Sequence, residues 1–599
     1  MHEPPSSTAG ADRVPSGLRY VPALDGIRAI AVAAVLLYHG GVTWMPGGFL
    51  GVDLFFVLSG YLITSLLLRE REATGGVDLA RFWLRRARRL LPAAFLVIAG
   101  SLAVLAVAFP EEAAQTRADA LASLAYVNNW HQIVADQSYF ATFERPSLLQ
   151  HLWSLAVEEQ FYLLWPLALG LCLTRLGRRG AMLVTLGGAL ASALLMGVLF
   201  DPGQDPSRVY FGTDTHASGL LVGALLAFAW PLGPLRSTPQ RGAVTLLDAG
   251  ALAGLVVVGW AMTTWQDYDP WVYRGGLLTF AVAAAVVIGA TAHEASRVGR
   301  WLGVQPLRWI GQRSYGIYLY HWPVMALTRP ELDLDWNRTL LLGLQLAVTV
   351  AIAAASYRWV EQPIRTGTAQ RAIRAALDRR PPRGRLAIAL AATLAVVVPA
   401  SWVATRDAPA RQDAATLAST KSAAAAARPA SEPATAKKPR GRPLAVGASV
   451  MLAAQTSLGR HATVDAAVGR QTSDIIGRLA YYRSAGQLPS RVIVQLGENG
   501  PVWGADVRAL RAALRGVDDV VLVNVRVPRR WNDEVNSILA ETVEHWPEAR
   551  LADWHAASAA GGLLYDDGTH PNPEGQEAYA KLIVRALRED AAAAPPDAS

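Results

Sequence analysis

The stretch LDGIRAIAVAAVLLYHGG, residues 24–41, decides the fold class, because it is an apolar segment of membrane-spanning length that carries ionisable side chains. Arg28 and His39 are eleven positions apart. On an α-helix this spacing brings them within about 20° of the same face and about 16 Å apart along the axis. Asp25 lies one turn before Arg28 and shares this face.

The depth of His39 suggests a function. With Arg28 at the water boundary, His39 lies halfway or more through a hydrocarbon layer about 30 Å thick. An ionisable group at that depth is costly unless it faces a cavity or a partner, so we interpret the pair as a candidate functional site. The alternative is a snorkelling arginine and a structural histidine that is hydrogen-bonded within the bundle.

The composition indicates a membrane protein. Of 599 residues, 52% are hydrophobic and 17% are charged, against about 25% charged residues in soluble domains. The net charge of +8 comes from arginines placed between apolar runs, which fits positive-inside orientation better than nucleic-acid binding. The sole cysteine, Cys172, excludes an intramolecular disulfide, and we expect no metal site.

Eleven apolar stretches approach the ~20 residues of a membrane crossing and predict a polytopic α-helical bundle of about 11 transmembrane helices. They cover residues 25–44, 49–68, 90–109, 151–172, 181–200, 214–231, 244–263, 274–292, 315–329, 339–359 and 386–404. Their connections alternate between arginine-rich and arginine-poor. This bias predicts a cytoplasmic N-terminus and places everything after about residue 405 outside the membrane.

Composition also divides the chain. Residues 444–590 alternate short β-branched runs with helix-like stretches, which is typical of an α/β domain with a parallel sheet. The predicted parts are a disordered leader (1–19), a membrane domain (20–365), a cytoplasmic loop with the last transmembrane helix (366–404), a flexible linker (405–443), the α/β domain (444–590) and a disordered tail (591–599).

A group of four arginines in FWLRRARRLLP is placed just before the third span. The group consists of Arg85, Arg86, Arg88 and Arg89. Guanidinium groups bind phosphate oxygens in a bidentate fork, so this cluster is a candidate site for a phosphate-bearing ligand. Anchoring at the inner membrane face is the alternative.

Further polar groups begin three other apolar spans, and together they predict a polar core in the bundle. HLWSLAVEEQFY places His151, Ser154 and Glu158 on one helix face, with Glu159 beside it. The other groups are Asp214 and His216 in GTDTHASG and His321 in RSYGIYLYHWP. A solvated face is not available in lipid, so an active site or a pore lining explains the residues as a set. A hydrogen-bonded structural group is the alternative for each of them taken singly.

Five of these motifs occur in a fixed order: YVPALDGIRAIAVAAVLLYH, GGFLGVDLFFVLSGYLI, FWLRRARRLLPA, HLWSLAVEEQFYLLWP and RSYGIYLYHWP. The region of about residues 20–365 thereby resembles the acyltransferase-3 family of bacterial integral-membrane acyltransferases. The resemblance implies transfer of an acetyl or other short acyl group from cytoplasmic acyl-CoA to a cell-surface glycan. It also implies that Arg28 and His39 are the intramembrane pair, that the four arginines meet the CoA phosphates, and that Glu158 and Glu159 are the acidic pair.

The α/β domain contains the residues of a nucleophilic site. Ser449, in VGASV, follows a predicted strand and precedes a helix, where backbone amides can hold an oxyanion. Asp567 and His570, in YDDGTH, can complete a triad with it. Gly469 and Asn499 each follow an apolar run and are suitable oxyanion donors.

Ser449, Gly469, Asn499 and His570 together resemble the four name-giving residues of the SGNH (GDSL-like) hydrolase family, with Asp567 as the triad acid. That family usually has Asp before the nucleophile, whereas this chain has Ala448. Both a catalytic domain and a binding or degenerate one remain open. Fusion of the two domains is a known arrangement in bacterial surface-glycan O-acetylation.

The combined hypothesis is an O-acyltransferase of the bacterial cytoplasmic membrane that takes acyl groups from acyl-CoA. In it His39 handles the acyl group and Ser449 completes the transfer outside. The acceptor is open among teichoic acid, peptidoglycan, exopolysaccharide, lipopolysaccharide and a glycosylated small molecule. The alternatives are a polytopic transporter or flippase, in which His39 and the carboxylates line a path, and a membrane-anchored surface carbohydrate esterase.

Overall fold

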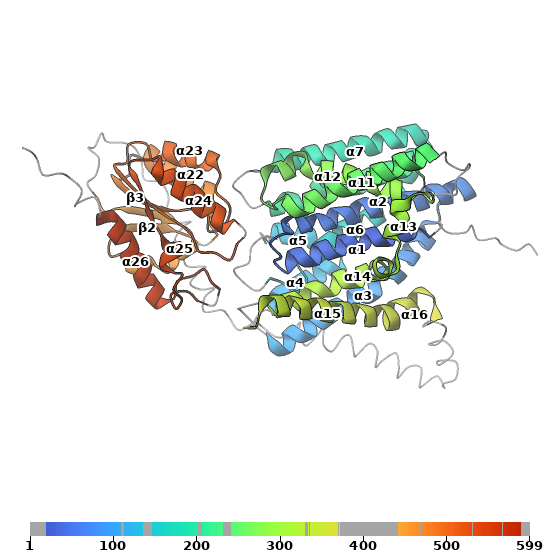
Figure 1. The fold of residues 1–599 in the computed structure, drawn as a ribbon, viewed down its shortest axis with the longest axis horizontal. Helices are drawn as coiled ribbons and strands as arrows, with labels where there is room; N and C mark the ends of the chain where they lie inside the picture. Colours follow the sequence, from blue (N-terminus) through green and yellow to red (C-terminus); the bar gives the residue numbers. More distant parts are fainter. Residues whose placement is uncertain are drawn as a thin grey trace, which may run out of the picture.

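The computed structural model describes two parts of the chain, a helical bundle and an α/β domain (Figure 1). The described residues are 20–109, 113–135, 146–201, 206–231, 241–329, 334, 336–368, 371, 441–467, 469–529, 531–565 and 567–588. The predicted leader, the last predicted span (386–404) and the predicted tail lie outside these residues, as does the predicted linker apart from residues 441–443.

Ten long helices build the bundle. They are α1 (Pro22–His39), α2 (Gly51–Thr74), α3 (Leu79–Ala108), α6 (Leu152–Arg175), α7 (Gly177–Leu199), α10 (Ser218–Ala229), α11 (Arg241–Thr264), α12 (Leu277–Thr291), α14 (Gln305–Leu327) and α15 (Arg338–Ser356). Shorter elements connect them. These are η1 (Pro46–Leu50), α4 (Ala113–Leu124), α5 (Asn128–Val134), α8 (Ser207–Phe211), α9 (Thr213–His216), η3 (Val272–Gly276), α13 (Arg297–Leu302), η4 (Tyr357–Glu361) and α16 (Gln362–Arg365).

Seven helical segments within the described ranges are long and apolar enough to cross a membrane, and the chain is a multi-pass membrane protein. Seven of the predicted spans match these segments, and the predicted count of about 11 is not confirmed, since the span 386–404 lies outside the described residues. Three of the predicted spans correspond to α6, α9 with α10, and α14, which are helical but too short or too polar on average. Two physical reasons apply. The helix α10 has only 12 residues and is largely buried, and α6 and α14 carry polar side chains such as Glu158 and His321 that lower their mean hydropathy.

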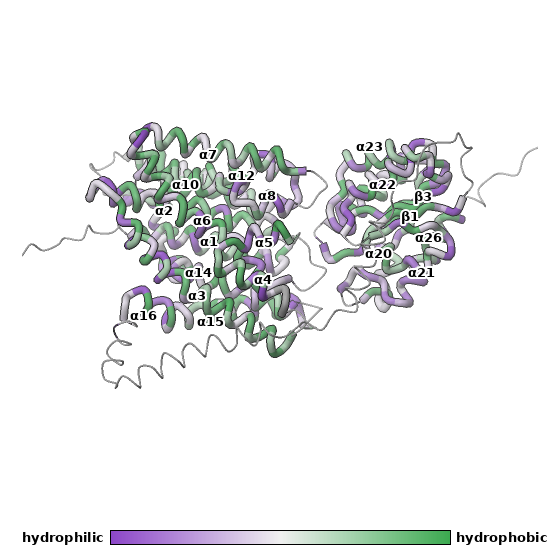
Figure 2. The backbone as a smooth tube through the Cα atoms, turned by 180° about the vertical axis from the view of Figure 1, so that it is seen from behind, coloured by the Kyte–Doolittle hydropathy of each residue, from purple (hydrophilic) through white to green (hydrophobic). Residues whose placement is uncertain are grey.

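The outer surface of the bundle is apolar. Figure 2 shows hydrophobic residues along α7 and α15, at the outside of the bundle. Leu183 and Leu194 of α7 are 67% and 69% exposed, and Leu340 of α15 is 66% exposed. Helices with such outward-facing leucines fit a lipid environment.

Glycines allow two pairs of helices to cross closely. A Cβ at Gly311 of α14 would lie 1.8 Å from the carbonyl oxygen of Asp25 in α1. A Cβ at Gly60 of α2 would lie 1.9 Å from the carbonyl oxygen of Leu220, and one at Gly223 of α10 would lie 2.0 Å from that of Val57. The α1–α14 and α2–α10 pairs therefore hold the polar residues of the bundle core at fixed separations.

The α/β domain is built on the predicted parallel sheet. Its strands are β1 (Leu444–Gly447), β2 (Thr463–Ala466), β3 (Arg491–Gln495), β4 (Asp519–Val523) and β5 (Ala549–Ala552), all parallel, in the order β2-β1-β3-β4-β5. The helices are α20 (Ser449–Ala453), α21 (Gln455–Leu458), α22 (Thr472–Ser484), α23 (Gly504–Ala513), α24 (Asn532–Glu544), α25 (Trp554–Ala557) and α26 (Pro573–Arg588). Two apolar clusters bury the two faces of the sheet. Because the strands are parallel, the residues that follow β1, β2 and β3 meet at one edge.

Tyr268, in the connection between α11 and η3, joins the two parts of the chain. Its hydroxyl donates to Glu534 at 3.1 Å, and its ring lies 5.9 Å from the rings of Trp503 and Trp531. Its neighbour Asp267 accepts a hydrogen bond from Tyr38, the residue before His39. The end of the bundle that carries His39 therefore faces the α/β domain.

Candidate active sites

A cavity of about 350 Å³ lies among α1, α2, α3, α6 and α14. Its walls combine apolar side chains with cations and hydrogen-bonding groups. The polar lining residues are Tyr20, Asp25, Arg28, Ser59, Arg86, Arg89, Ser154, Glu158, Tyr162, Ser314, Tyr315 and Tyr318. Such a cavity, largely apolar with a few convergent polar groups, is typical of a small-molecule site.

Glu158 is the fixed carboxylate of this cavity. Tyr162, one turn further along α6, donates a hydrogen bond to Oε1 of Glu158 at 2.5 Å, and Ser59 of α2 donates to the same oxygen. Tyr162 also lies 3.1 Å from the Ser59 hydroxyl. Glu159 does not line the cavity, and its Oε1 is buried with no hydrogen-bond partner among the residues that the structure describes. Of the predicted acidic pair, Glu158 is therefore the member that faces the site.

The four predicted arginines divide into two pairs. The third helix begins at Leu79, so these residues lie on α3 itself and not before it as the apolar pattern suggested. Arg86 and Arg89, three positions apart on one face, line the cavity. Arg85 pairs with Glu70 at 3.3 Å, and Arg88 is exposed. On α1, Arg28 lines the same cavity and donates to Asp25 at 2.9 Å.

His39 contacts a second histidine. Its Nδ1 lies 2.9 Å from Nε2 of His321, and the two rings stack with centroids 5.1 Å apart. The Nδ1 of His321 lies 2.5 Å from the carbonyl oxygen of Tyr318, so this nitrogen carries the proton and Nε2 accepts. His39 therefore donates from Nδ1, and in the neutral ring its basic lone pair is on Nε2. His151 lies beside this pair, with its ring centroid 5.7 Å from that of His321.

The position of His39 within its helix is defined by α1. This helix begins at Pro22 and ends at His39, so the imidazole lies at the end of an 18-residue helix, eleven residues after Arg28. The residues that line the cavity do not include His39. Ser154 and Tyr318 lie between them, with their hydroxyls 2.6 Å apart, and Tyr318 also donates to the carbonyl of His151 at 2.9 Å. One layer of side chains therefore separates the cavity from the histidines.

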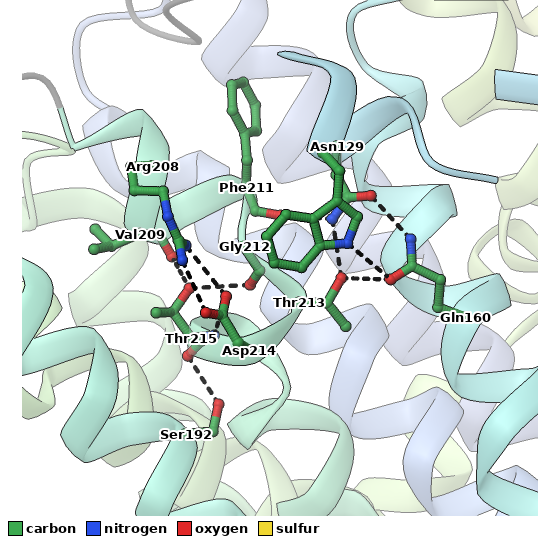
Figure 3. Close-up of polar contacts among 11 residues, drawn as sticks. Asn129, Gln160, Ser192, Arg208, Val209, Phe211, Gly212, Thr213, Asp214 and Thr215 are labelled. Carbon is green, nitrogen blue, oxygen red and sulfur yellow. Dashed lines mark hydrogen bonds and ion pairs between the residues drawn. The ribbon is translucent and has the colours of Figure 1, made fainter. Parts of the chain in front are cut away.

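Asp214 and His216 lie outside the cavity lining. Figure 3 shows Asp214 held by Arg208, at 2.8 Å for the shorter contact, next to hydrogen bonds that join Asn129, Gln160 and Thr213. His216 is buried and contacts Asp53 at 2.8 Å. Asp214 therefore joins α9 to α8, and His216 positions α9 against α2.

In the α/β domain the structure brings the predicted triad together. Nε2 of His570 lies 2.8 Å from Oγ of Ser449, and its Nδ1 lies 2.5 Å from Oδ2 of Asp567. Burial alone would raise the pKa of Asp567. Hydrogen bonds from His570 and from two backbone amides lower it by a larger amount, so the net pKa lies below its ordinary value. Burial lowers the pKa of His570, but the hydrogen bond and charge of Asp567 raise it more.

The predicted oxyanion donors follow β2 and β3, the two strands that flank β1 in the sheet. Ser449 begins α20 directly after β1, and Ala448 before it is buried. Gly469, which follows β2, has a φ of +77°, a conformation that favours glycine. The side-chain amide of Asn499 donates to the carbonyl of Arg470 at 3.0 Å. In this arrangement the Asn499 amide holds the loop after β2 in place.

Glu498 is a residue of this site that the motifs did not indicate. It is 2% exposed, accepts a hydrogen bond from the Ser449 hydroxyl, and accepts another from the backbone amide of Val450 at 3.0 Å. The available signal was a carboxylate in QLGENG, directly after a buried strand. In the bundle, Asp53 was missed in the same way, although GVDLFF shows a carboxylate inside an apolar run.

Comparison with known proteins identifies the family of the bundle. The model of the acyltransferase family described as "Acyltransferase domain" (Acyl_transf_3) matches residues 21–358. The chain belongs to the acyltransferase-3 family. It is therefore an acyltransferase, as the sequence motifs predicted.

Several relatives match this acyltransferase-3 protein along nearly its whole length. The peptidoglycan O-acetyltransferase OatA of Listeria monocytogenes is 36% identical, over 95% of this chain and 99% of its own. The O-acetyltransferase OatA of Staphylococcus aureus strain NCTC 8325 is 34% identical, over 96% of this chain and 97% of its own. The relatives therefore extend through both the bundle and the α/β domain.

Two solved structures are similar to part of the chain. The C-terminal catalytic domain of Streptococcus pneumoniae peptidoglycan O-acetyltransferase A, with a methylsulfonyl adduct, is 22% identical with a TM-score of 0.24 and covers 25% of this chain and 93% of that one. A GDSL-like lipase from Bacteroides thetaiotaomicron is 14% identical with a TM-score of 0.24, covering 29% of this chain and 97% of that one.

Proposed function

We propose that this chain is a membrane O-acetyltransferase that moves an acetyl group from cytoplasmic acetyl-CoA to a hydroxyl of peptidoglycan outside the membrane. The observation that carries the proposal is the cavity of the bundle. It joins three arginines to a hydrogen-bonded carboxylate and ends one side-chain layer from the histidine pair. The names of the relatives support acetyl as the group transferred and peptidoglycan as the acceptor.

The donor binds first. Arg86 and Arg89 hold phosphate groups of the donor, because each guanidinium offers a bidentate fork of hydrogen bonds to phosphate oxygens. The thioester arm enters between apolar walls that include Phe55 and Leu62. Exclusion of water by these walls protects the thioester from hydrolysis.

His39 then handles the acyl group. A thioester already has a good leaving group, so the missing element is a base for the attacking hydroxyl or a nucleophile that takes the acyl group. His321 fixes the proton of His39 on Nδ1, which leaves Nε2 as the basic atom. Arg28 and Glu158 organise the donor side of the site.

The final transfer takes place in the α/β domain. The Oγ of Ser449 attacks the acyl carbonyl, its proton moves to Nε2 of His570, and Asp567 stabilises the imidazolium. When Nε2 of His39 carries the acyl group, the bond between this nitrogen and the acyl carbon breaks, and the released imidazole nitrogen takes the proton from His570. The acceptor hydroxyl then attacks the acyl-serine in the same way and regenerates Ser449.

Two observations support the proposed orientation. The arginine-rich connections of the sequence favour a cytoplasmic N-terminus and an external α/β domain. The contacts of Tyr38 with Asp267 and of Tyr268 with Glu534 link the His39 end of the bundle to the α/β domain. An acyl group that leaves His39 therefore emerges near the domain that contains Ser449.

The test uses full-length protein in sealed vesicles that expose the cytoplasmic face, supplied with radiolabelled acetyl-CoA and enclosed peptidoglycan fragments. We expect His39→Gln to abolish labelling of the enclosed glycan. Ser449→Ala should also abolish it, whereas the exposed matched variant Ser484→Ala should label normally. Undiminished labelling by His39→Gln would refute the role of the bundle, and undiminished labelling by Ser449→Ala would reduce the α/β domain to binding.

The triad geometry also supports a surface esterase as a second candidate. In that case full-length protein would release acetate from O-acetylated peptidoglycan with no acetyl-CoA present, and His39→Gln would leave this release unchanged. Dependence of glycan acetylation on acetyl-CoA and on His39 distinguishes the transferase from the esterase. It also distinguishes the transferase from a transporter, which needs no acyl donor.

A further inference from the structure

Glu498 occupies the space that the triad chemistry needs. It lies in the turn after β3, between Gly497 and Asn499, and the indole of Trp531 fixes this turn by donating to the carbonyl of Gly497 at 3.0 Å. One carboxylate oxygen, Oε1, accepts from the Ser449 hydroxyl and the Val450 amide. The other oxygen is buried and has no hydrogen-bond partner among the described residues.

The hydrogen bonds around Ser449 require one proton more than a simple triad holds. Nε2 of His570, Oγ of Ser449 and Oε1 of Glu498 form a row of three atoms with two contacts. Each contact needs a hydrogen, while the Nδ1 hydrogen of His570 is already used on Asp567. With only the serine hydrogen available, one contact would place two lone pairs against each other.

The extra proton has two possible positions. In the first arrangement His570 is charged, donates to Oγ, and the serine donates to an ionised Glu498. In the second arrangement both hydrogens have moved along the row, so Glu498 is neutral and donates to Oγ while the serine donates to a neutral His570. Only the second leaves Nε2 able to accept the serine proton, as a general base must.

The carboxylate also affects the oxyanion position. The Val450 amide belongs to the first turn of α20, where backbone N–H groups stabilise a developing negative charge. An ionised Glu498 on this amide repels the oxyanion of a tetrahedral intermediate. A neutral Glu498 removes that repulsion.

We propose that Glu498 is a positioning residue that switches Ser449 between a resting and an acting arrangement by taking one proton from His570 through the serine hydroxyl. The inference rests on the proposed function, in which Ser449 carries the acyl group. In the step, the Nε2–H bond of His570 and the Oγ–H bond of Ser449 break while new Oγ–H and Oε1–H bonds form. No proton is exchanged with solvent. The acyl carbonyl then enters beside an uncharged side chain.

Ionisable groups near Glu498 favour retention of the extra proton. Burial raises the pKa of Glu498, although hydrogen bonds from Ser449 and Val450 and the charge of His570 oppose the shift. The charge of Glu498 in turn contributes to the raised pKa of His570. Tyr579 of α26 also faces Glu498, and its hydroxyl donates to Gln495.

The test measures how fast a small sulfonyl fluoride modifies Ser449 in detergent-solubilised full-length protein, at pH values from 5 to 9. Peptide mass spectrometry quantifies the modified Ser449 at each time point. We expect Glu498→Gln, which keeps the size and removes the charge, to react severalfold faster at pH 7, because the charge of Glu498 raises the pKa of His570. The midpoint of its rate–pH curve should move to lower pH. The matched variant is Glu541→Gln, an exposed glutamate on α24, which should behave like the unaltered protein.

Glu498→Ala and thermal unfolding of each variant complete the design. If Glu498→Ala also reacts faster while the unfolding temperatures stay equal, the effect comes from the charge and supports the switch. Modification of Glu498→Gln at the rate and pH profile of the unaltered protein would overturn the switch while leaving Ser449 as the nucleophile. No modification of Ser449 in any variant would overturn the proposed function together with the switch.

Discussion

Substitution of Gly311 by alanine tests whether the α1–α14 crossing positions the histidines. The new Cβ would lie 1.8 Å from the carbonyl oxygen of Asp25. A carbon and a carbonyl oxygen approach to about 3.3 Å, so the helices must separate by about 1.5 Å. His39 and His321 lie on these two helices and are 2.9 Å apart, so the same separation breaks their hydrogen bond.

The expected magnitude follows from the cost of misplaced catalytic groups. A displacement of about 1 Å lowers a rate about 10²-fold, so we expect Gly311→Ala to lower acetyl transfer about 100-fold. The assay is alkali-released acetate per unit of peptidoglycan, at equal amounts of membrane-inserted protein. The matched control is Gly343→Ala on α15, where no atom lies within 4 Å of the new Cβ. Transfer by Gly311→Ala within about threefold of the control would refute the reasoning.

Two further predictions concern charged groups. In a steady-state assay, Arg86→Gln should raise the KM for acetyl-CoA about tenfold with little change in kcat. Arg88→Gln, which removes an exposed arginine, should leave both constants unchanged. Equal effects of the two substitutions would contradict the assignment of Arg86 to the cavity and of Arg88 to the surface. Burial raises the pKa of Asp465, but the hydrogen bonds and charges of Arg470 and Arg478 lower it by more, so the net pKa is below the ordinary value. The ionised Asp465 therefore stabilises the fold above about pH 4, and this stabilisation is lost as the pH falls through the lowered pKa. Asp465→Asn should therefore lower the free energy of unfolding of the α/β domain by about 2 kcal/mol at pH 7, measured by hydrogen exchange. The difference should shrink as the pH falls below about 4, and a constant difference would contradict the assignment.

The α/β domain could be predicted well from the sequence. Its β-branched runs are short, regularly spaced and separated by helical stretches, so the parallel sheet followed directly. Ser449 and His570 are 121 positions apart, but both follow from motifs that parallel topology brings to one edge. Glu498 was missed because a charged residue in a loop after a strand is ordinary in sequence, and only the packing against Ser449 gives it a role.

The bundle was harder to predict in detail, because hydropathy indicates which segments are apolar but not which helices lie in the interior of the bundle. The twelve-residue α10 is interior, so it needs no full apolar span. The end of α1 at His39 has a signal in the sequence, because Gly40 and Gly41 follow it directly, the latter with a φ of +69°. The division of the arginines follows from helical periodicity once α3 is known to begin at Leu79.

The layer formed by Ser154 and Tyr318 also bears on the membrane potential of the cell. A protein that passes chemical groups across a bilayer risks becoming a leak for ions, and each charge that crosses dissipates about 2.3 kcal/mol per 100 mV of membrane potential. The hydroxyls of Ser154 and Tyr318 are 2.6 Å apart, so no water molecule fits directly between them. We expect this contact to limit ion leakage, so vesicles that contain Tyr318→Ala protein should discharge a membrane potential faster than vesicles with the unaltered protein.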